Sequence, residues 1–353
     1  MPNGAKECFK PKLPKENEDV ERNSRHADLV GFLNGTKALP SRFLDHYRLG
    51  ELLGDGAFGF VMTATRLKDN LEVAVKFIAS NKIPRELWVP DPNHPHLCKI
   101  PNEIKILQTL NHPNIIKYID HIIEGPYILL ITELHGNEWT HSNTIAHKHN
   151  NQLDRCDGDQ EKQIRRKTSC DLFECIDKRI PEPLARKIFA QIAFAVNYLH
   201  ERNLVHRDLK DENIVIDANY AIKIIDFGSV ATIPQRKCDY FTRFNGTIHF
   251  ASPEITNNQP YRGPEAEMWS MGVLLYTMVF GENPFHNPAD IIRGDFRMPF
   301  DAELESDKDG EGCRHLIKRL LTYNQNDRAT MEEVLHHKWM RDEVVLLKAK
   351  YGL

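Results

Sequence analysis

The chain has 353 residues, 41% of them hydrophobic and 27% charged, so it can bury a large core in one two-part unit or in two domains. Its net charge of −4, from 46 basic and 50 acidic residues, excludes the broad positive field used to bind nucleic acid or anionic lipid. Its seven cysteines are odd in number and lack paired CxxC spacing, which favours a reducing compartment over a disulfide framework.

The N-terminus is polar and has no apolar signal core, and the longest apolar stretch, around 271–281, is too short to span a bilayer. We therefore expect a soluble monomer in the cytoplasm, with the nucleus as the alternative location. We expect no membrane partner and no nucleic-acid partner.

Residues 1–46 begin with a segment rich in Lys, Glu, Asn and Pro, so we expect a partly disordered extension, with ordered structure from about Tyr47. Apolar and β-branched residues then alternate with polar ones over 61–65 and 73–77, on either side of a turn at Asp69. This alternation predicts a β-hairpin.

A helix is predicted over 102–110, where apolar residues recur at helical spacing. Two strand-like runs follow at 115–123 and 127–134, while the proline-rich stretch 84–101 predicts a long loop. This half of the chain thus predicts a small, mostly antiparallel sheet with one main helix.

Segment 137–169 is polar and has no periodicity, which predicts a mobile insertion. From about residue 170 helical patterns dominate, so we expect a larger helical lobe and an α+β fold. The predicted helices cover 181–202, 264–280, 313–321 and 331–339.

The stretch 206–213 (His-Arg-Asp-Leu-Lys-Asp-Glu-Asn), followed by Asp-Phe-Gly at 226–228, collects the groups that phosphoryl transfer needs. Asp208 can orient a hydroxyl and Lys210 can neutralise a phosphate. Asn213 and Asp226 can ligate Mg²⁺ through hard oxygen atoms. His-Arg-Asp and Asp-Phe-Gly each occur by chance in other proteins. Their presence together, each beside an apolar run, favours a functional site.

A G-x-G-x-x-G-x-V pattern runs from Gly54 to Val61, and its glycines allow the backbone to approach phosphates closely. A dinucleotide-binding fingerprint looks similar, but it requires a helix directly after the glycines, and here a strand is predicted. We interpret the pattern as a hairpin over ATP. Its residues are Leu53, Gly54, Asp55, Gly56, Ala57, Phe58, Gly59 and Val61.

The next predicted strand contains Ala74 and Lys76, and Glu103 lies on the first predicted helix. Lys76 can bridge the α- and β-phosphates while Glu103 holds it in place. Two alternatives stay open: Lys76 is an ordinary surface lysine, or another acid, such as Glu72, pairs with it.

From about Tyr47 to Trp339 the chain resembles the eukaryotic protein kinases, because Ser-Pro-Glu at 252–254 completes the motifs above. The resemblance implies a bilobal kinase fold over 47–340, with an N-lobe and hinge to 136, a C-lobe from 170 and a C-terminal tail at 341–353. It implies ATP and Mg²⁺ as cofactors, protein substrates, and a structural ion pair between Glu254 and Arg328. The implied catalytic residues are Asp208, Lys210 and Asn213; the implied ATP contacts are the hairpin residues with Ala74, Lys76, Glu103, Glu133 and Asp226; and the implied metal ligands are Asn213 and Asp226.

Lys210 and the Gly246-Thr247 pair are similar to serine/threonine kinases. Asp211, where many kinases have Pro, and Gly-Glu-Asn-Pro-Phe at 281–285 resemble the PAS-domain kinases most, and the Pim kinases next. This branch implies a role in nutrient or metabolic signalling, although the region before the first predicted strand is too short for a PAS domain.

The chain departs from the kinase pattern at two positions near the stretch 206–213, which we call the catalytic loop. Glu267 stands where most kinases have an Asp that supports this loop, and Arg243 stands where many have a phosphorylated Thr. We expect some rearrangement of the loop, and activity that does not depend on a phosphate on nearby Thr242. Glu212 and Asp171 resemble positions that recognise an upstream Arg in substrates, which predicts a preference for one basic residue.

Two other function classes remain as alternatives. A pseudokinase scaffold predicts loss of Lys76, Asp208, Asn213 or Asp226, and all four are present. A small-molecule kinase predicts the absence of the segment 252–254, which is also present.

Overall fold

The structure is a computed structural model of the chain, and it describes residues 27–56, 59–91, 99–136, 171–176, 179–236, 238–299 and 311–352. Two compact units are distinguished: a sheet unit from 13–84 and 119–169, and a helical unit that includes 85–118 and 170–353. The predicted insertion at 137–169 lies outside the described residues.

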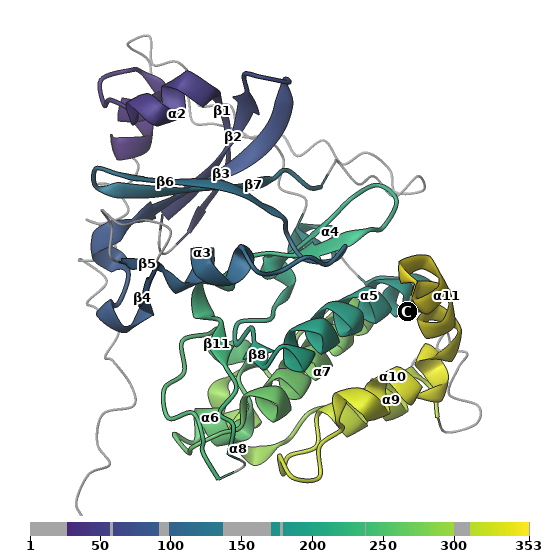
Figure 1. Cartoon of the computed structure of the whole chain (residues 1–353). Helices are drawn as coiled ribbons and strands as arrows, with labels where there is room; N and C mark the ends of the chain where they lie inside the picture. Colours follow the sequence, from purple (N-terminus) through teal and green to yellow (C-terminus); the bar gives the residue numbers. More distant parts are fainter. Residues whose placement is uncertain are drawn as a thin grey trace, which may run out of the picture. The chain divides into compact units, whose positions relative to one another are not determined.

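Five strands form the sheet, in the order β1-β2-β3-β7-β6 (Figure 1). The pairs β1–β2, β2–β3 and β3–β7 are antiparallel. The predicted hairpin is confirmed as β2 and β3, and its turn places Asn70 at φ 57°, a left-handed conformation that Asn tolerates. The strands are Tyr47–Gly56 (β1), Gly59–Arg66 (β2), Leu71–Ala79 (β3), Tyr118–Glu124 (β6) and Tyr127–Glu133 (β7).

Ordered structure begins well before the first strand, so our prediction of its start near residue 47 is wrong. Residues 27–33 are helical, α2 covers Ser41–His46, and both lie beside the sheet in Figure 1. Leu29, Phe32 and Phe43 are buried in the same core as β2, β3 and β7. The helical spacing of Leu29 and Phe32 is real, but the polar composition averaged over the whole extension concealed it.

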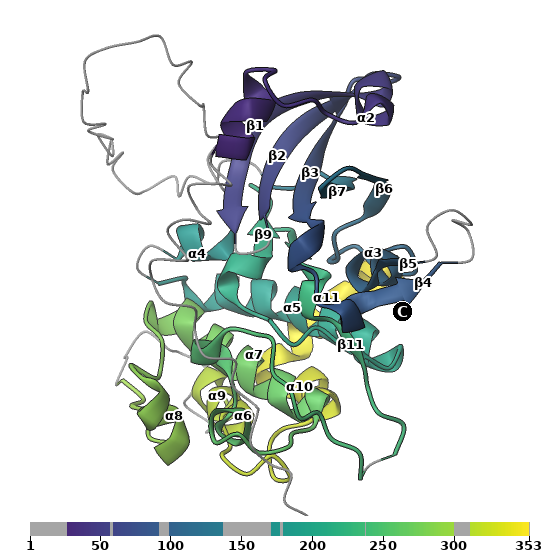
Figure 2. The same cartoon turned by 90° about the vertical axis from the view of Figure 1, so that its left-hand side faces the viewer.

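Two long helices, α5 (Glu182–Glu201) and α7 (Gly263–Phe280), pack against each other in the helical unit (Figure 2). Both predicted helices are confirmed. Each has a proline in its first turn, where a missing N–H costs nothing. α7 ends at Phe280, and the next residue, Gly281, forms a left-handed C-terminal cap with a φ of 75°.

Shorter elements surround this pair. The stretch predicted as a loop at 84–101 contains two paired strands, because its extended residues find a partner in each other. Within the predicted tail, residues 341–351 form a helix. The helices are α3 (Asn102–Leu107), α4 (Leu172–Cys175), α6 (Pro253–Thr256), α8 (Pro288–Arg293), α9 (Cys313–Leu320), α10 (Met331–His336) and α11 (Arg341–Tyr351), and the strand pairs are β4 (Trp88–Pro90) with β5 (Lys99–Pro101), β8 (Leu204–Val205) with β11 (Ala231–Thr232), and β9 (Ile214–Ile216) with β10 (Ile222–Ile224).

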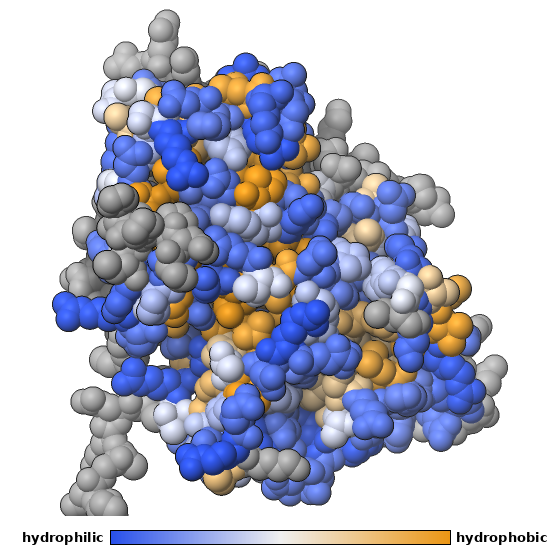
Figure 3. Space-filling view, in the orientation of Figure 1, coloured by the Kyte–Doolittle hydropathy of each residue, from blue (hydrophilic) through white to orange (hydrophobic). Residues whose placement is uncertain are grey.

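These elements confirm the predicted α+β class, with an antiparallel sheet and a larger helical part. No helix among the described residues is both long and apolar enough to cross a membrane. The face in Figure 3 is mostly hydrophilic, and apolar residues gather at the surface over α11, where Val345 and Leu346 are exposed.

Candidate active site

The glycine-rich segment forms the turn end of the β1–β2 hairpin, where Gly54 pairs with Val61 and Gly56 with Gly59. A Cβ on Gly59 would lie 1.7 Å from the carbonyl oxygen of Phe77 in β3, so only glycine fits there. A strand follows the glycines, as the ATP interpretation requires. Leu53 and Asp55 also lie in β1, whereas Ala57 and Phe58 lie outside the described residues.

Ala74 and Lys76 lie in β3, and Glu133 ends the neighbouring strand β7. Lys76 points away from the sheet core, because the residues on either side of it are fully buried and side chains alternate along a strand. Glu103 belongs to the helical unit. Its pairing with Lys76 would join the two units, and it stays a prediction.

Asp208 and Asn213 come together in the catalytic loop. The amide nitrogen of Asn213 donates to the carbonyl oxygen of Asp208 over 2.8 Å and to its Oδ2 over 3.2 Å. The other carboxylate oxygen, Oδ1, accepts from the backbone N–H and the hydroxyl of Thr247, both over 2.8 Å. These contacts fix the orientation of the Asp208 carboxylate. Thr247 is a partner that we did not predict, and its only signal in the sequence is the Gly246-Thr247 pair.

Lys210 is close to the carboxylates of Glu212, Asp208 and Asp226. Burial alone would lower the pKa of Lys210, but its hydrogen bond to Glu212 and the charges of Asp208 and Asp226 raise this pKa above the ordinary value of 10.5. Lys210 is therefore protonated at neutral pH, and it presents a positive charge beside the loop acids.

Asp226 has a left-handed backbone (φ 60°), and its carboxylate accepts a hydrogen bond from the Gly228 N–H over 3.3 Å. It caps the short 3₁₀ helix Phe227–Ser229. Just before it, the Ile225 N–H donates to the carbonyl oxygen of Asn213 over 2.9 Å. This backbone bond joins the two segments that carry the predicted metal ligands.

Glu103 is buried on α3, close to the same segment. A Cβ on Gly228 would lie 3.2 Å from Oδ1 of Asp226 and 3.7 Å from Oε2 of Glu103, so both carboxylates approach this glycine. The side chain of Asn102 donates to the carbonyl oxygen of Val230 over 3.2 Å, which ties the start of α3 to the residues after Asp226.

The donor set fits Mg²⁺. Both of these hydrogen bonds of the Asn213 side chain use its nitrogen, which leaves the amide oxygen available to a cation that Asp226 would also hold. Among the described residues no group of three or more His, Cys, Asp or Glu is arranged to hold a metal ion. A magnesium–nucleotide complex needs only one or two protein oxygens, because phosphates and water supply the rest.

Glu267 of α7 supports the catalytic loop, although the sequence has Glu where most kinases have Asp. Its Oε1 accepts from the backbone N–H groups of His206 (2.8 Å) and Arg207 (3.0 Å), and its Oε2 lies 2.6 Å from Nε2 of His200. Burial would raise the pKa of Glu267, but the contact with His200 and nearby positive charge hold it below 4.5. No motif in the sequence marks His200 as the partner of this carboxylate.

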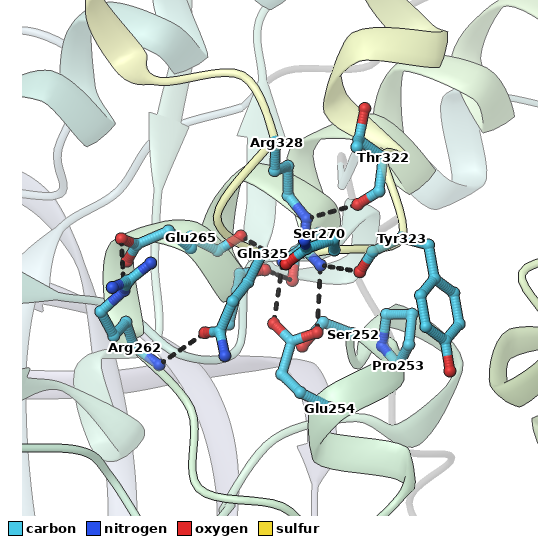
Figure 4. A network of polar contacts seen from close by, with 12 residues as sticks. Ser252, Pro253, Glu254, Arg262, Glu265, Ser270, Thr322, Tyr323, Gln325 and Arg328 are labelled. Carbon is cyan, nitrogen blue, oxygen red and sulfur yellow. Dashed lines mark hydrogen bonds and ion pairs between the residues drawn. The ribbon is translucent and has the colours of Figure 1, made fainter.

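The ion pair implied between Glu254 and Arg328 is also present (Figure 4). Two hydrogen bonds of 2.9 and 3.0 Å join the guanidinium to the carboxylate, and both side chains are buried. The arginine also donates to the backbone carbonyl oxygens of Thr322, Tyr323 and Glu265. The pair therefore connects α6 with the loop before α10.

Curated proteins similar to this chain are protein kinases by name. The chain is 36% identical to the mouse PAS domain-containing serine/threonine-protein kinase over 316 residues, which cover 89% of this chain and 20% of that protein. It is 32% identical over 312 residues to the serine/threonine-protein kinase PSK2 of Saccharomyces cerevisiae, covering 87% of this chain and 25% of the yeast protein. Both relatives are thus several times longer than the matched region.

A shorter relative matches over most of its own length. The chain is 34% identical to the zebrafish (Danio rerio) serine/threonine-protein kinase pim-2 over 315 residues, which cover 86% of this chain and 87% of that protein. The family model described as "Protein kinase domain" matches residues 47–340. With the fold and the loop geometry above, these matches establish that this chain belongs to the protein kinase family.

Proposed function

We propose that this protein is an active ATP- and Mg²⁺-dependent kinase that phosphorylates Ser or Thr hydroxyls of proteins, in the manner of PAS-domain kinases. The observation that carries the proposal is the Asp208 carboxylate, held by Asn213 on one oxygen and by Thr247 on the other. A carboxylate fixed in this way can align a hydroxyl for in-line attack.

The chain's own residues account for positioning and charge. Asp208 accepts the hydrogen bond of the substrate hydroxyl, and protonated Lys210 neutralises charge that develops on the transferred phosphoryl group. Asn213 and Asp226 would hold Mg²⁺ through their oxygens, and Lys76 would hold the nucleotide phosphates. When bound, the magnesium–ATP complex supplies the phosphoryl group and shields its charge.

The alternative is a pseudokinase that binds partners without catalysis. It is disfavoured because Asp208, Asn213 and Asp226 are all present, and hydrogen bonds join Asn213 to Asp208 and to Ile225, the residue before Asp226. A pseudokinase would not need a protonated Lys210 beside these carboxylates, because it transfers no phosphoryl group.

Transfer of labelled phosphate from ATP onto a peptide library tests the proposal. We expect the wild-type protein to label Ser and Thr peptides in the presence of Mg²⁺, and we expect Asp226→Asn to label none, because the neutral amide lacks the negative charge that anchors the cation. Equal labelling by both proteins would show a contaminating kinase and reject the assignment. Nucleotide binding by the wild-type protein without any transfer would favour the pseudokinase.

We propose that aromatic packing is enough to hold the activation segment, which runs from Asp226 to Glu254, without a phosphate. The Nε of Arg207 donates to the Ser229 carbonyl oxygen over 2.7 Å, and its guanidinium lies 5.2 Å from the centre of the Phe241 ring. Phe241 stacks on Tyr261 at 5.5 Å, and the Tyr261 hydroxyl donates to the carbonyl oxygen of Arg243 over 2.9 Å. Arg207 thus has a carbonyl oxygen and an aromatic ring as partners, and these contacts do not require a phosphorylated residue.

We therefore expect Thr242→Ala to keep its activity within about twofold of wild type, since surface substitutions change little. Phe241→Ala should lower activity, because it removes the ring between Arg207 and Tyr261. Initial rates of peptide phosphorylation, with mass spectrometry of residue 242, measure both effects. Loss of transfer in a folded Thr242→Ala protein would reject this account.

We also propose a preference for one basic residue upstream of the target hydroxyl. Glu212 is exposed and contacts Lys210, so it lies beside the catalytic loop. Asp171 forms a bridge with Val215, two residues after Asn213, and caps α4. Both acids therefore belong to segments next to the Asp208 loop, which supports the proposal that they meet a peptide whose hydroxyl reaches Asp208.

A peptide with Arg three residues before Ser, compared with its Ala counterpart, tests this preference. We expect kcat/KM to fall by up to roughly fivefold on the Arg→Ala change in the wild-type protein, because an exposed ion pair contributes at most about 1 kcal/mol. In Glu212→Gln the two peptides should differ less. No difference between the peptides in the wild-type protein would reject the preference.

A further inference from the structure

The C-terminal helix α11 lies outside the kinase-domain match, which ends at residue 340, yet it packs on the helical unit. Val344 and Leu347 face inward and are buried, and α11 lies against α5 (Figure 1). The last residue of the helix, Tyr351, makes the most specific contacts of this element.

Tyr351 reaches the loop that follows α3. Its hydroxyl donates to Oδ1 of Asn114 over 2.5 Å. Its ring meets His112 edge-on, with centres 5.7 Å apart, and Phe194 of α5 at 6.0 Å. Burial raises the pKa of Tyr351, so the hydroxyl keeps its proton and remains a donor at neutral pH.

The side chain of Asn114 is buried, and both its nitrogen and its oxygen make hydrogen bonds. Its nitrogen donates to Oε1 of Gln191 in α5 over 3.0 Å and to the Ile222 carbonyl oxygen in β10 over 2.9 Å. Its amide oxygen therefore needs a donor, and Tyr351 supplies it. A buried acceptor that loses its donor is unfavourable, because neither water nor protein then satisfies it.

Asn114 also ties the loop to the strand that leads to Asp226. The Ile224 N–H donates to the Asn114 carbonyl oxygen over 2.9 Å, and the Ile116 N–H donates to the Ile224 carbonyl oxygen over 3.0 Å. Ile224 stands two residues before Asp226. At the other end of α3, Asn102 bonds to the segment after Asp226. The stretch 102–116, which contains α3 and Glu103, is thus held to the residues around Asp226 at both of its ends.

His112 adds to the same junction. Its Nδ1 accepts from the Asn114 N–H over 3.1 Å, which requires an unprotonated nitrogen. Burial, and the positive charges of Lys223 and Arg202, lower the pKa of His112 to about 4. The imidazole is therefore neutral at physiological pH, and Tyr351 packs against a stable, uncharged ring.

We propose that Tyr351 is a positioning residue for catalysis. From outside the family domain, it fixes Asn114 and so holds α3 and β10 in the arrangement that aligns Glu103 and Asp226. The inference rests on the proposed kinase activity for its kinetic effect, but the structural coupling stands without it.

The test compares Tyr351→Phe with Tyr323→Phe in the full chain. The control also loses one tyrosine hydroxyl, which donates to the Ile292 carbonyl oxygen over 3.0 Å in another part of the helical unit. In Tyr351→Phe we expect the amides of Ile116 and Ile224 to exchange hydrogen roughly fivefold faster. We also expect kcat for peptide phosphorylation to fall roughly threefold, with little change in the KM for the peptide. The control should change neither.

Three results would overturn the proposal. The first is wild-type exchange at both amides in Tyr351→Phe. The second is a lower melting temperature with unchanged kcat, which would leave Tyr351 a purely structural role. The third is an equal effect of Tyr323→Phe. If the wild-type protein transfers no phosphate, the proposed function fails, while the exchange data still decide whether Tyr351 fixes this junction.

Discussion

Glu254→Gln is expected to lower the free energy of unfolding by about 3–5 kcal/mol, because it leaves the Arg328 charge buried without a counter-charge. Glu254 is 6% exposed and Arg328 is 3% exposed, so water cannot replace the carboxylate. The backbone carbonyls around Arg328 still accept its N–H groups, but they do not neutralise it. Urea titration followed by circular dichroism measures the change.

The chain offers a matched control for this substitution. Arg319 and Glu333 form the same two-bonded pair, at 2.6 and 2.9 Å, but both side chains are about one-third exposed. Glu333→Gln should cost only about 0–1 kcal/mol, because solvent screens an exposed pair. Equal costs for the two variants would show that burial does not govern the strength of the pair.

The same substitution separates stability from chemistry. The ion pair of Glu254 is with Arg328, which is not in the proposed catalytic set, so the Glu254→Gln protein that remains folded at low temperature should keep most of its kcat. A double variant, Glu254→Leu with Arg328→Met, should be more stable than the single variant, since it removes both charges. Wild-type melting combined with absent activity would contradict this account.

Much of the site was predictable because its residues are close in sequence. Asp208 and Asn213 lie in one loop, and Asp226 follows after a short strand pair, so their spacing alone brings them together. The pairing of Glu254 with Arg328 spans 74 positions, and no periodicity predicts it. It followed only from resemblance, because a family pattern records contacts that local physics does not reveal.

Other contacts were missed for physical reasons. The helix at 27–33 was not predicted because the average composition of the extension is polar. Its packing depends on a few apolar residues, such as Phe32, which that average does not reveal. His200 and Tyr351 are a histidine and a tyrosine on ordinary helices, and only the tertiary fold places them beside Glu267 and Asn114. Burial of a polar group defines such roles, and burial is a property of the folded chain.

Glu267→Ala should reduce kcat by roughly 10²-fold, because a displacement of about 1 Å in catalytic groups can have this effect. The carboxylate holds two backbone N–H groups, and one of them belongs to Arg207, whose left-handed backbone (φ 66°) is unfavourable for a side chain of its size. Without that acceptor the loop is free to relax to an ordinary conformation. Asp208, the next residue, would then lose its alignment.

Glu267→Asp should lie between wild type and Glu267→Ala. In the wild-type protein, one carboxylate oxygen of Glu267 binds the loop amides and the other contacts the ring of His200. Asp is one methylene shorter, so it can reach the amides or the ring, but not both. Glu265→Ala is the control: it removes an acid of the same helix that pairs with Arg262 at 2.7 Å near the surface. Initial rates at saturating peptide, with melting temperatures of each variant, separate the loop effect from unfolding. Full activity of a folded Glu267→Ala protein would mean that the loop keeps its conformation without this carboxylate, and the role assigned to Glu267 would be wrong.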